Sequence, residues 1–140
     1  RREKMSKIKI FECTKDGGPD SPVTAYFLIE WKDCFSIALL KFNVGGREAY
    51  HTHAFNALTW FLKGSMVEQD IGGEVYVYRR RLLPKHTPRT KNHRVLAKEV
   101  SWCITLRGPW VQVWTEHLKG VRTIFTWGRV KYLKKGDNNE

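Results

Sequence analysis

The stretch that decides the fold is GGREAYHTHAFNALTWFLKG, residues 45–64. It begins with two glycines, carries the imidazoles of His51 and His53 two residues apart, and ends on Gly64. Side chains alternate between the two faces of a β-strand, so imidazoles two residues apart point to the same side. The stretch therefore predicts a strand with two candidate metal ligands on one face.

A second motif, PRTKNH at residues 88–93, adds a third imidazole, His93. The spacing Gly-x5-His-x-His-x3-Ala-x6-Gly, followed after residues 65–87 by Pro-x-Thr-x2-His, resembles the paired motifs of the cupin family. The resemblance implies an all-β protein with a cupin-type jelly-roll β-barrel that holds a metal ion in its mouth. It also implies that His51, His53 and His93 are the metal ligands.

The sequence departs from the family pattern at the fourth ligand. Ala57 stands where the family has Glu, and Thr90 stands where it has Gly. A site with three histidines and no carboxylate resembles that of one group within the family, the thiol dioxygenases similar to cysteine dioxygenase. Those enzymes bind Fe(II). The resemblance therefore implies a three-His Fe(II) site and oxygenase-type chemistry. The accessory Ser-His-Tyr set of those enzymes does not appear here.

A narrower resemblance covers more of the chain. It rests on a set of positions between residues 55 and 128: Phe55, Thr59, Leu62, Gly64, Glu68, His93, Arg94, Trp102, Thr105, Leu106, Gly108, Pro109, Trp114, Trp127 and Gly128. Together these residues resemble the pattern of small microbial and phage cupins of undetermined activity. This likeness supports the fold and leaves the reaction open.

The rest of the chain predicts β-strands, because short apolar runs alternate with Gly, Pro, Asn and Asp. This pattern is typical of a sandwich or barrel. The expected strands are Lys7–Cys13, Val23–Trp31, Phe35–Phe42, Phe55–Leu62, Met66–Gln69, Glu74–Leu83, His93–Leu96, Ser101–Leu106, Val111–His117 and Val121–Leu133. Pro84–Asn92 is expected to form a loop. We expect one domain over residues 5–133, with frayed ends at 1–4 and 134–140.

Length and composition indicate one folded domain. The chain has 140 residues, 41% of them hydrophobic, and a formal net charge of +11. No segment approaches the roughly 20 apolar residues of a membrane span, and no apolar run follows the basic N-terminus. The three cysteines, Cys13, Cys34 and Cys103, form no CxxC pair. We expect buried free thiols and a cytoplasmic protein without a membrane partner.

Three neutral imidazoles suit several divalent transition metals. Fe(II) is the cofactor we favour, with Zn, Ni, Mn, Co and Cu as alternatives. Because no ligand is anionic, the site would keep the full charge of the metal ion. Such a site should attract a small anionic ligand or lower the pKa of a bound water.

Positive charge gathers between Val75 and Lys98, a segment without acidic residues. We take Arg79 and Arg81, which share a strand face, as candidate substrate-binding residues, and add Arg107, which could clamp a carboxylate or phosphate. Glu68 is the carboxylate candidate for a catalytic role, either as general base or as support for a ligand. The competing interpretation is an exposed strand residue.

These features favour a metal-dependent enzyme acting on a small anionic substrate, most simply a three-His Fe(II) oxygenase. Two alternatives stay open. One is a non-catalytic barrel that binds a nucleotide or sugar-phosphate, and the other is a basic nucleic-acid-binding protein whose affinity would fall steeply with salt. The family resemblance also allows a homodimer that forms through sheet edges.

Overall fold

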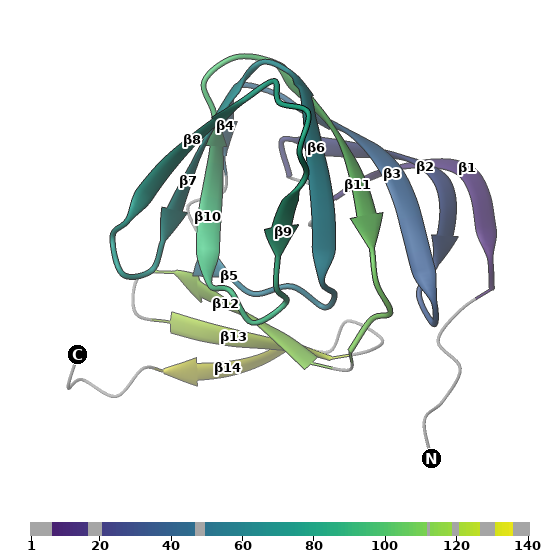
Figure 1. The fold of residues 1–140 in the computed structure, drawn as a ribbon. Coiled ribbons are helices and arrows are strands. Elements are labelled where there is room, and N and C mark those ends of the chain that lie inside the picture. The colour runs from purple at the N-terminus through teal and green to yellow at the C-terminus, as the bar shows by residue number, and fades with distance from the viewer. Residues whose placement is uncertain are drawn as a thin grey trace.

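The computed structural model describes residues 7–16, 21–46, 50–111, 113–118, 121–126 and 131–135. Over these residues the chain forms fourteen strands and no helix, which confirms the expected all-β class. The strands build two antiparallel sheets that face each other (Figure 1). The described part of the chain holds no helix of the length and apolar character that crossing a membrane requires.

The first sheet has six strands in the order β1-β2-β3-β11-β6-β9. Their bounds are β1 Lys9–Lys15, β2 Val23–Trp31, β3 Phe35–Phe42, β11 Ser101–Arg107, β6 Ala57–Lys63 and β9 Lys85–Thr87. The second sheet has the order β14-β13-β12-β5-β10-β7-β8, with β4 also paired to β10. Its bounds are β14 Lys131–Lys135, β13 Val121–Thr126, β12 Val113–Leu118, β5 Tyr50–His51, β10 His93–Ala97, β7 Ser65–Asp70, β8 Val75–Arg79 and β4 Gly45–Gly46.

The hairpin of β2 and β3 shows how the sequence pattern sets the inner face. In β3, Ser36, Ala38 and Leu40 are buried and alternate with half-buried neighbours. This period of two is what a strand with one face in the core requires. The two strands match their predicted bounds, and three residues, 32–34, connect them.

The core lies between the two sheets. One apolar cluster draws residues from β2, β3, β6, β7 and β11: Ala25, Phe27, Ala38, Leu40, Phe61, Met66 and Cys103. Tyr78 of β8 adds its ring, stacked on Phe61 with centroids 4.9 Å apart. Buried polar residues, among them Glu68, His93 and Thr105, share the interior with this apolar cluster.

Gly64 carries the chain from the first sheet to the second. Its φ of 99° lies in a region that side-chain-bearing residues rarely adopt. A Cβ atom at this position would lie 2.2 Å from Oγ of Ser101 on β11. Both constraints explain why the motif ends on glycine at this residue.

The structure corrects several predicted segments. The region Pro84–Asn92, predicted as a loop, contains the short strand β9. The predicted strand Glu74–Leu83 ends at Arg79, and Val121–Leu133 is two strands, β13 and β14, with residues 127–130 outside the described ones. β14 also includes Lys134 and Lys135, which were predicted to belong to a frayed tail. The predicted N-terminal end, residues 1–4, lies outside the described residues.

The prediction that all three thiols are buried is wrong for two of them. Cys13 on β1 and Cys34 in the β2–β3 connection are exposed, whereas Cys103 is fully buried. Apolar neighbours in the sequence do not reveal which face of a strand a residue occupies, and every residue of β1 is exposed.

The environments of the three thiols predict their reactivity. Burial raises the pKa of the Cys103 thiol to about 12, and its Sγ lies 3.6 Å from Sδ of Met66. Because the thiolate is the reactive form, Cys103 should resist a thiol reagent in the native protein. In a colorimetric thiol titration we expect Cys13 and Cys34 to react in buffer and Cys103 only in denaturant. Fast modification of Cys103 in the folded protein would contradict this burial.

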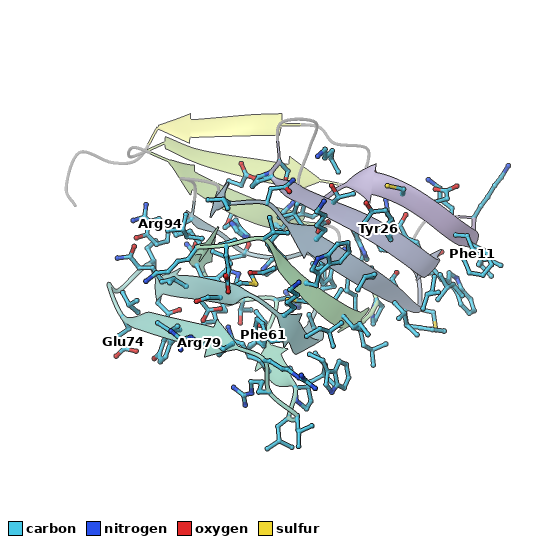
Figure 2. The ribbon with its side chains drawn as sticks, turned by 90° about the horizontal axis from the view of Figure 1, so that it is seen from above. Phe11, Tyr26, Phe61, Glu74, Arg79 and Arg94 are labelled. Carbon is cyan, nitrogen blue, oxygen red and sulfur yellow. The ribbon has the colours of Figure 1, made fainter. Side chains whose placement is uncertain are left out.

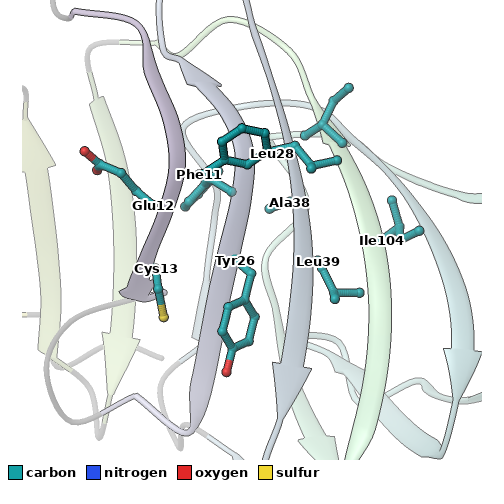
Figure 3. Close-up of a pocket in the computed structure, with 10 residues that line it drawn as sticks. Phe11, Glu12, Cys13, Tyr26, Leu28, Ala38, Leu39 and Ile104 are labelled. Carbon is teal, nitrogen blue, oxygen red and sulfur yellow. The ribbon is translucent and has the colours of Figure 1, made fainter.

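The outer face of the first sheet carries an open apolar groove of about 410 Å³ (Figure 3). Phe11, Tyr26, Leu28, Leu39 and Ile104 line it, together with Cys13. Figure 2 shows Phe11 at the outer end of this sheet, far from Arg94 and Glu74 on the second sheet. The groove therefore lies on the outside of the barrel and shares no residue with the imidazoles.

Candidate metal centre

Three imidazoles meet inside the barrel from two neighbouring segments. His51 ends β5 and is paired in register with His93, the first residue of β10. His53 follows two residues later, and its backbone N–H donates a hydrogen bond of 3.1 Å to the carbonyl of Arg89. Thr52, between them, is bonded to Thr115 of β12 through both its backbone and its side chain.

The imidazoles form a nearly regular triangle. The ring centroids of His51, His53 and His93 lie 4.9, 5.0 and 5.1 Å apart. One nitrogen from each ring lies within 4.8 Å of the others, and Nε2 of His53 is 2.7 Å from Nε2 of His93. Nitrogens that bind one metal ion at about 2.1 Å lie roughly 3 Å or a little more apart. The three side chains therefore fit a single transition-metal ion after a small adjustment.

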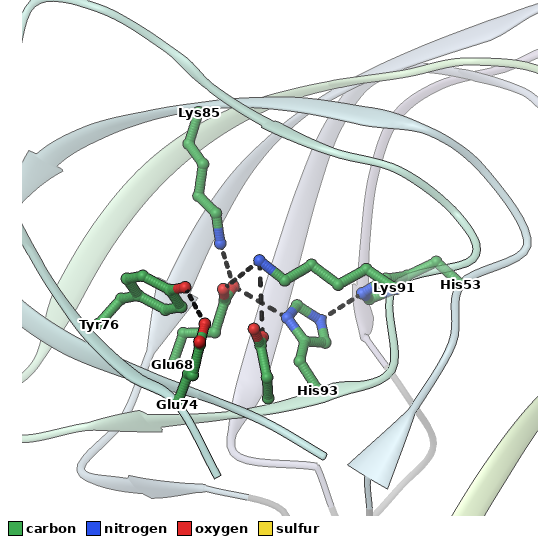
Figure 4. A network of polar contacts seen from close by, with 8 residues as sticks. His53, Glu68, Glu74, Tyr76, Lys85, Lys91 and His93 are labelled. Atoms are coloured by element: carbon green, nitrogen blue, oxygen red, sulfur yellow. Dashed lines mark hydrogen bonds and ion pairs between the residues drawn. The ribbon is translucent and has the colours of Figure 1, made fainter. Parts of the chain in front are cut away.

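Glu68 contacts the side of the His93 ring that faces away from His53, so it is not one of the candidate ligands (Figure 4). Its Oε2 is 2.9 Å from Nδ1 of His93, and the residue is only 2% exposed, which excludes the exposed-strand interpretation. Burial raises the pKa of this carboxyl, but hydrogen bonds from His93, Lys85 and Lys91 outweigh it and hold the pKa well below its usual range. A carboxylate so bound is a weak base, so its geometry suits support of His93 rather than proton abstraction from a substrate.

Two lysines also contact the carboxylate of Glu68. The sequence predicted no individual role for either of them. Lys85 of β9 contacts Oε2, and Lys91 lies 2.7 Å from Oε1 and 3.6 Å from Asp70. Burial lowers the pKa of Lys85, whereas Glu68 and Asp70 together outweigh burial and raise the pKa of Lys91. The ammonium groups also lie over Tyr78 and Tyr76, at 4.5 and 5.5 Å from the ring centroids.

The position of the family's carboxylate ligand is apolar here. Ala57 is buried together with Ala54 and Phe55, and Trp110 and Trp114 pack against this cluster. The ring of Phe55 lies 5.5 Å from that of His53. An apolar, aromatic cluster therefore lies next to His53.

Arg79 lies far along the second sheet from His93. On β7, Ser65 pairs with Arg79, whereas Asp70 pairs with His93, five residues further along. Five residues of strand span about 17 Å. Arg79 and Arg81 are both exposed. Lys85 and Lys91, in contrast, contact Glu68, the carboxylate next to His93.

Arg107 is the last residue of β11, but its side chain is buried rather than open to a substrate. It is 3% exposed, and its two terminal nitrogens lie 3.3 and 2.6 Å from the carboxylate oxygens of Asp16. Its guanidinium also lies over the rings of Phe27 and Phe55, at 5.4 and 4.6 Å. The two-pronged contact that we predicted for a substrate is thus made with Asp16.

Comparison with known proteins places the fold. The sequence matches no protein-family profile and no curated protein sequence, whereas 148 chains of solved structures match. One is a sugar phosphate isomerase of the cupin superfamily from Silicibacter pomeroyi, with a TM-score of 0.59, 11% identity and coverage of 94% of this chain and 89% of that one. An RmlC-like cupin from Shewanella frigidimarina matches with a TM-score of 0.55 and 16% identity over 71% of this chain and 84% of that one.

An ectoine synthase from P. lautus is a third match, with a TM-score of 0.55, 18% identity and coverage of 69% of this chain and 70% of that one. At such identities the likeness concerns the fold alone, and the matched proteins include enzymes with different reactions.

Proposed function

Because the chain has the cupin fold, we propose that it is a metal-dependent enzyme acting on a small anionic substrate, with His51, His53 and His93 as the ligands of a divalent transition metal. The single observation that carries the proposal is the convergence of three imidazole nitrogens within 4.8 Å. Solved cupins that resemble the chain include enzymes, which supports catalysis on this scaffold.

Fe(II) is the metal we propose first, and an oxygenase reaction is the simplest one that a three-His site supports. A metal held by three protein ligands keeps positions for water, substrate or O2, and acts as a Lewis acid there. The chain's own residues do the rest. The three imidazoles would hold the ion, Glu68 supports His93, and the ring of Phe55 packs beside His53, with Trp110 against Phe55.

Charge supports an anionic substrate. Glu68 and Asp70 contribute two negative charges near the cluster, and Lys85 and Lys91 contribute two positive ones. This network of two carboxylates and two ammonium groups is neutral as a unit, so it adds no net negative charge beside a bound divalent ion. A small carboxylate or phosphate is the simplest ligand to do so.

The proposal is tested by metal analysis of protein freed of any affinity tag. We expect about one equivalent of transition metal per chain after anaerobic reconstitution with Fe(II), and O2 uptake when the right small anionic compound is supplied. A panel of thiol carboxylates, hydroxy acids and sugar phosphates serves as the substrate set. Failure to retain Fe, Zn, Ni, Mn, Co or Cu would refute the metal site.

The same preparation separates the alternatives. A non-catalytic barrel that binds a nucleotide or sugar-phosphate would keep its ligand-induced rise in melting temperature after treatment with EDTA. A nucleic-acid-binding protein would bind through the basic Arg79–Lys98 surface and lose affinity steeply as salt rises. Loss of ligand binding on chelation favours the metal-dependent enzyme over both.

A further inference from the structure

The hydrogen bond between Glu68 and His93 has a defined direction. Oε2 of Glu68 and Nδ1 of His93 are 2.9 Å apart, and the two residues are 2% and 4% exposed. An ionised carboxylate can only accept hydrogen bonds, so Nδ1 of His93 must carry the proton that is shared with it. A neutral imidazole has one N–H, and Nε2 of His93 is then left with a lone pair.

That lone pair points to the ligand cluster. Nε2 of His93 is 2.7 Å from Nε2 of His53, which can donate its own N–H to it in the metal-free protein. A metal ligand needs a nitrogen without a proton, and the tautomer with the proton on Nδ1 provides one on the correct side of the ring. The other tautomer would turn an N–H towards the metal position.

The carboxylate of Glu68 is held in place by contacts with two lysines as well as with His93. Lys85 reaches it from β9, Lys91 from the segment before β10 and His93 from β10, so three segments contact one carboxylate that β7 supplies. The side chains of Lys85 and Lys91 are 11% and 25% exposed, and each lies over a tyrosine ring of β8. The ammonium groups compensate the carboxylate, which would otherwise be a buried, uncompensated charge.

We propose that Glu68 is a positioning residue that fixes His93 in the tautomer with the proton on Nδ1 and so directs Nε2 to the metal, with Lys85 and Lys91 holding the carboxylate in place. This inference rests on the proposed metal site but concerns a residue outside the ligand set. It gives a function to the ion cluster of Glu68, Asp70, Lys85 and Lys91. Three histidines alone would bind a metal without such a cluster.

The first test uses the unchanged, metal-free protein. Long-range ¹H–¹⁵N correlation NMR distinguishes a protonated from an unprotonated ring nitrogen, and a His93→Gln variant assigns the signals. We expect His93 to carry its proton on Nδ1 and none on Nε2. A proton on Nε2 and none on Nδ1 would overturn the proposal, whatever the variants do.

The second test compares Glu68→Gln with Glu74→Gln. Glu74 is an exposed carboxylate of the same sheet region that contacts Tyr76, so it controls for the chemical change alone. In Glu68→Gln the side chain keeps its size but loses its charge, and the new amide can present N–H groups to His93. Changes in such supporting groups typically weaken metal affinity by about 10–100-fold.

The measurement is a competition titration with Zn²⁺ and a chromophoric chelator, which needs no activity assay. We expect Glu68→Gln to weaken Zn²⁺ binding by about 10–100-fold and Glu74→Gln to leave it within about twofold. Equal affinity in the wild type and Glu68→Gln would overturn the positioning role alone. Absence of Zn²⁺ binding in the wild type would overturn the metal site and the positioning role together.

Discussion

Replacing His93 by alanine is expected to reduce bound metal from about one equivalent per chain to less than about a tenth. His93 is 4% exposed, is paired in register with His51, and is the imidazole that Glu68 contacts. Its removal leaves two ligands, which do not hold a divalent transition metal against a chelator. Metal content is measured by elemental analysis after reconstitution and gel filtration.

His86→Ala is the matched control for this prediction. His86 lies on β9, is exposed, and belongs to no metal-compatible group among the described residues. We expect this variant to retain the wild-type metal content. Full occupancy in His93→Ala, or a comparable loss in His86→Ala, would show that the metal is bound elsewhere.

The second large effect concerns stability. Asp16→Asn should lower the free energy of unfolding by about 3 kcal/mol, because it leaves the guanidinium of Arg107 buried without its counter-charge. Arg107 is 3% exposed, and Asp16 contacts both of its terminal nitrogens, at 3.3 and 2.6 Å. The side chain of Asp16 is 33% exposed. The expected loss of stability is therefore at the lower end of the range of about 3–5 kcal/mol for breaking a buried ion pair.

Urea denaturation followed by tryptophan fluorescence measures this loss. Glu12→Gln, in the exposed pair of Glu12 with Lys9 on β1, provides the control and should change stability by less than about 0.5 kcal/mol. Metal content should stay at the wild-type level in both variants. If Asp16→Asn costs no more than Glu12→Gln, the ion pair with Arg107 does not stabilise the fold.

Much of the fold follows from local pattern. The run of β-forming residues over 23–31, and the short turn that follows it, predict β2 and β3 with their observed bounds. The segment Pro84–Asn92 could not be assigned in this way. β9 has three residues, Lys-His-Thr, which show no apolar alternation, and its pairing with β6 depends on residues far away in the sequence.

The candidate site was predicted in part. The two motifs identify the three histidines because their spacing reflects short paired strands, in which His51 and His93 become direct neighbours. Arg107 could not be interpreted from the sequence, since its partner Asp16 is 91 residues away. The same holds for Lys85 and Lys91, whose basic charge is plain in the sequence but whose common contact with Glu68 requires three strands to assemble.

The strands that present the site also build the core. On β7, Met66 belongs to the apolar cluster and Glu68 to the ion cluster, and on β10 buried Ala97 and His93 lie at opposite ends of one strand. A site residue and a core residue on the same strand are thus only two or four residues apart. A lineage carrying this barrel can exchange its ligands, and with them its reaction, while the apolar contacts that keep it folded stay unchanged. For the same reason, directed evolution could vary the ligand positions while keeping the core residues fixed.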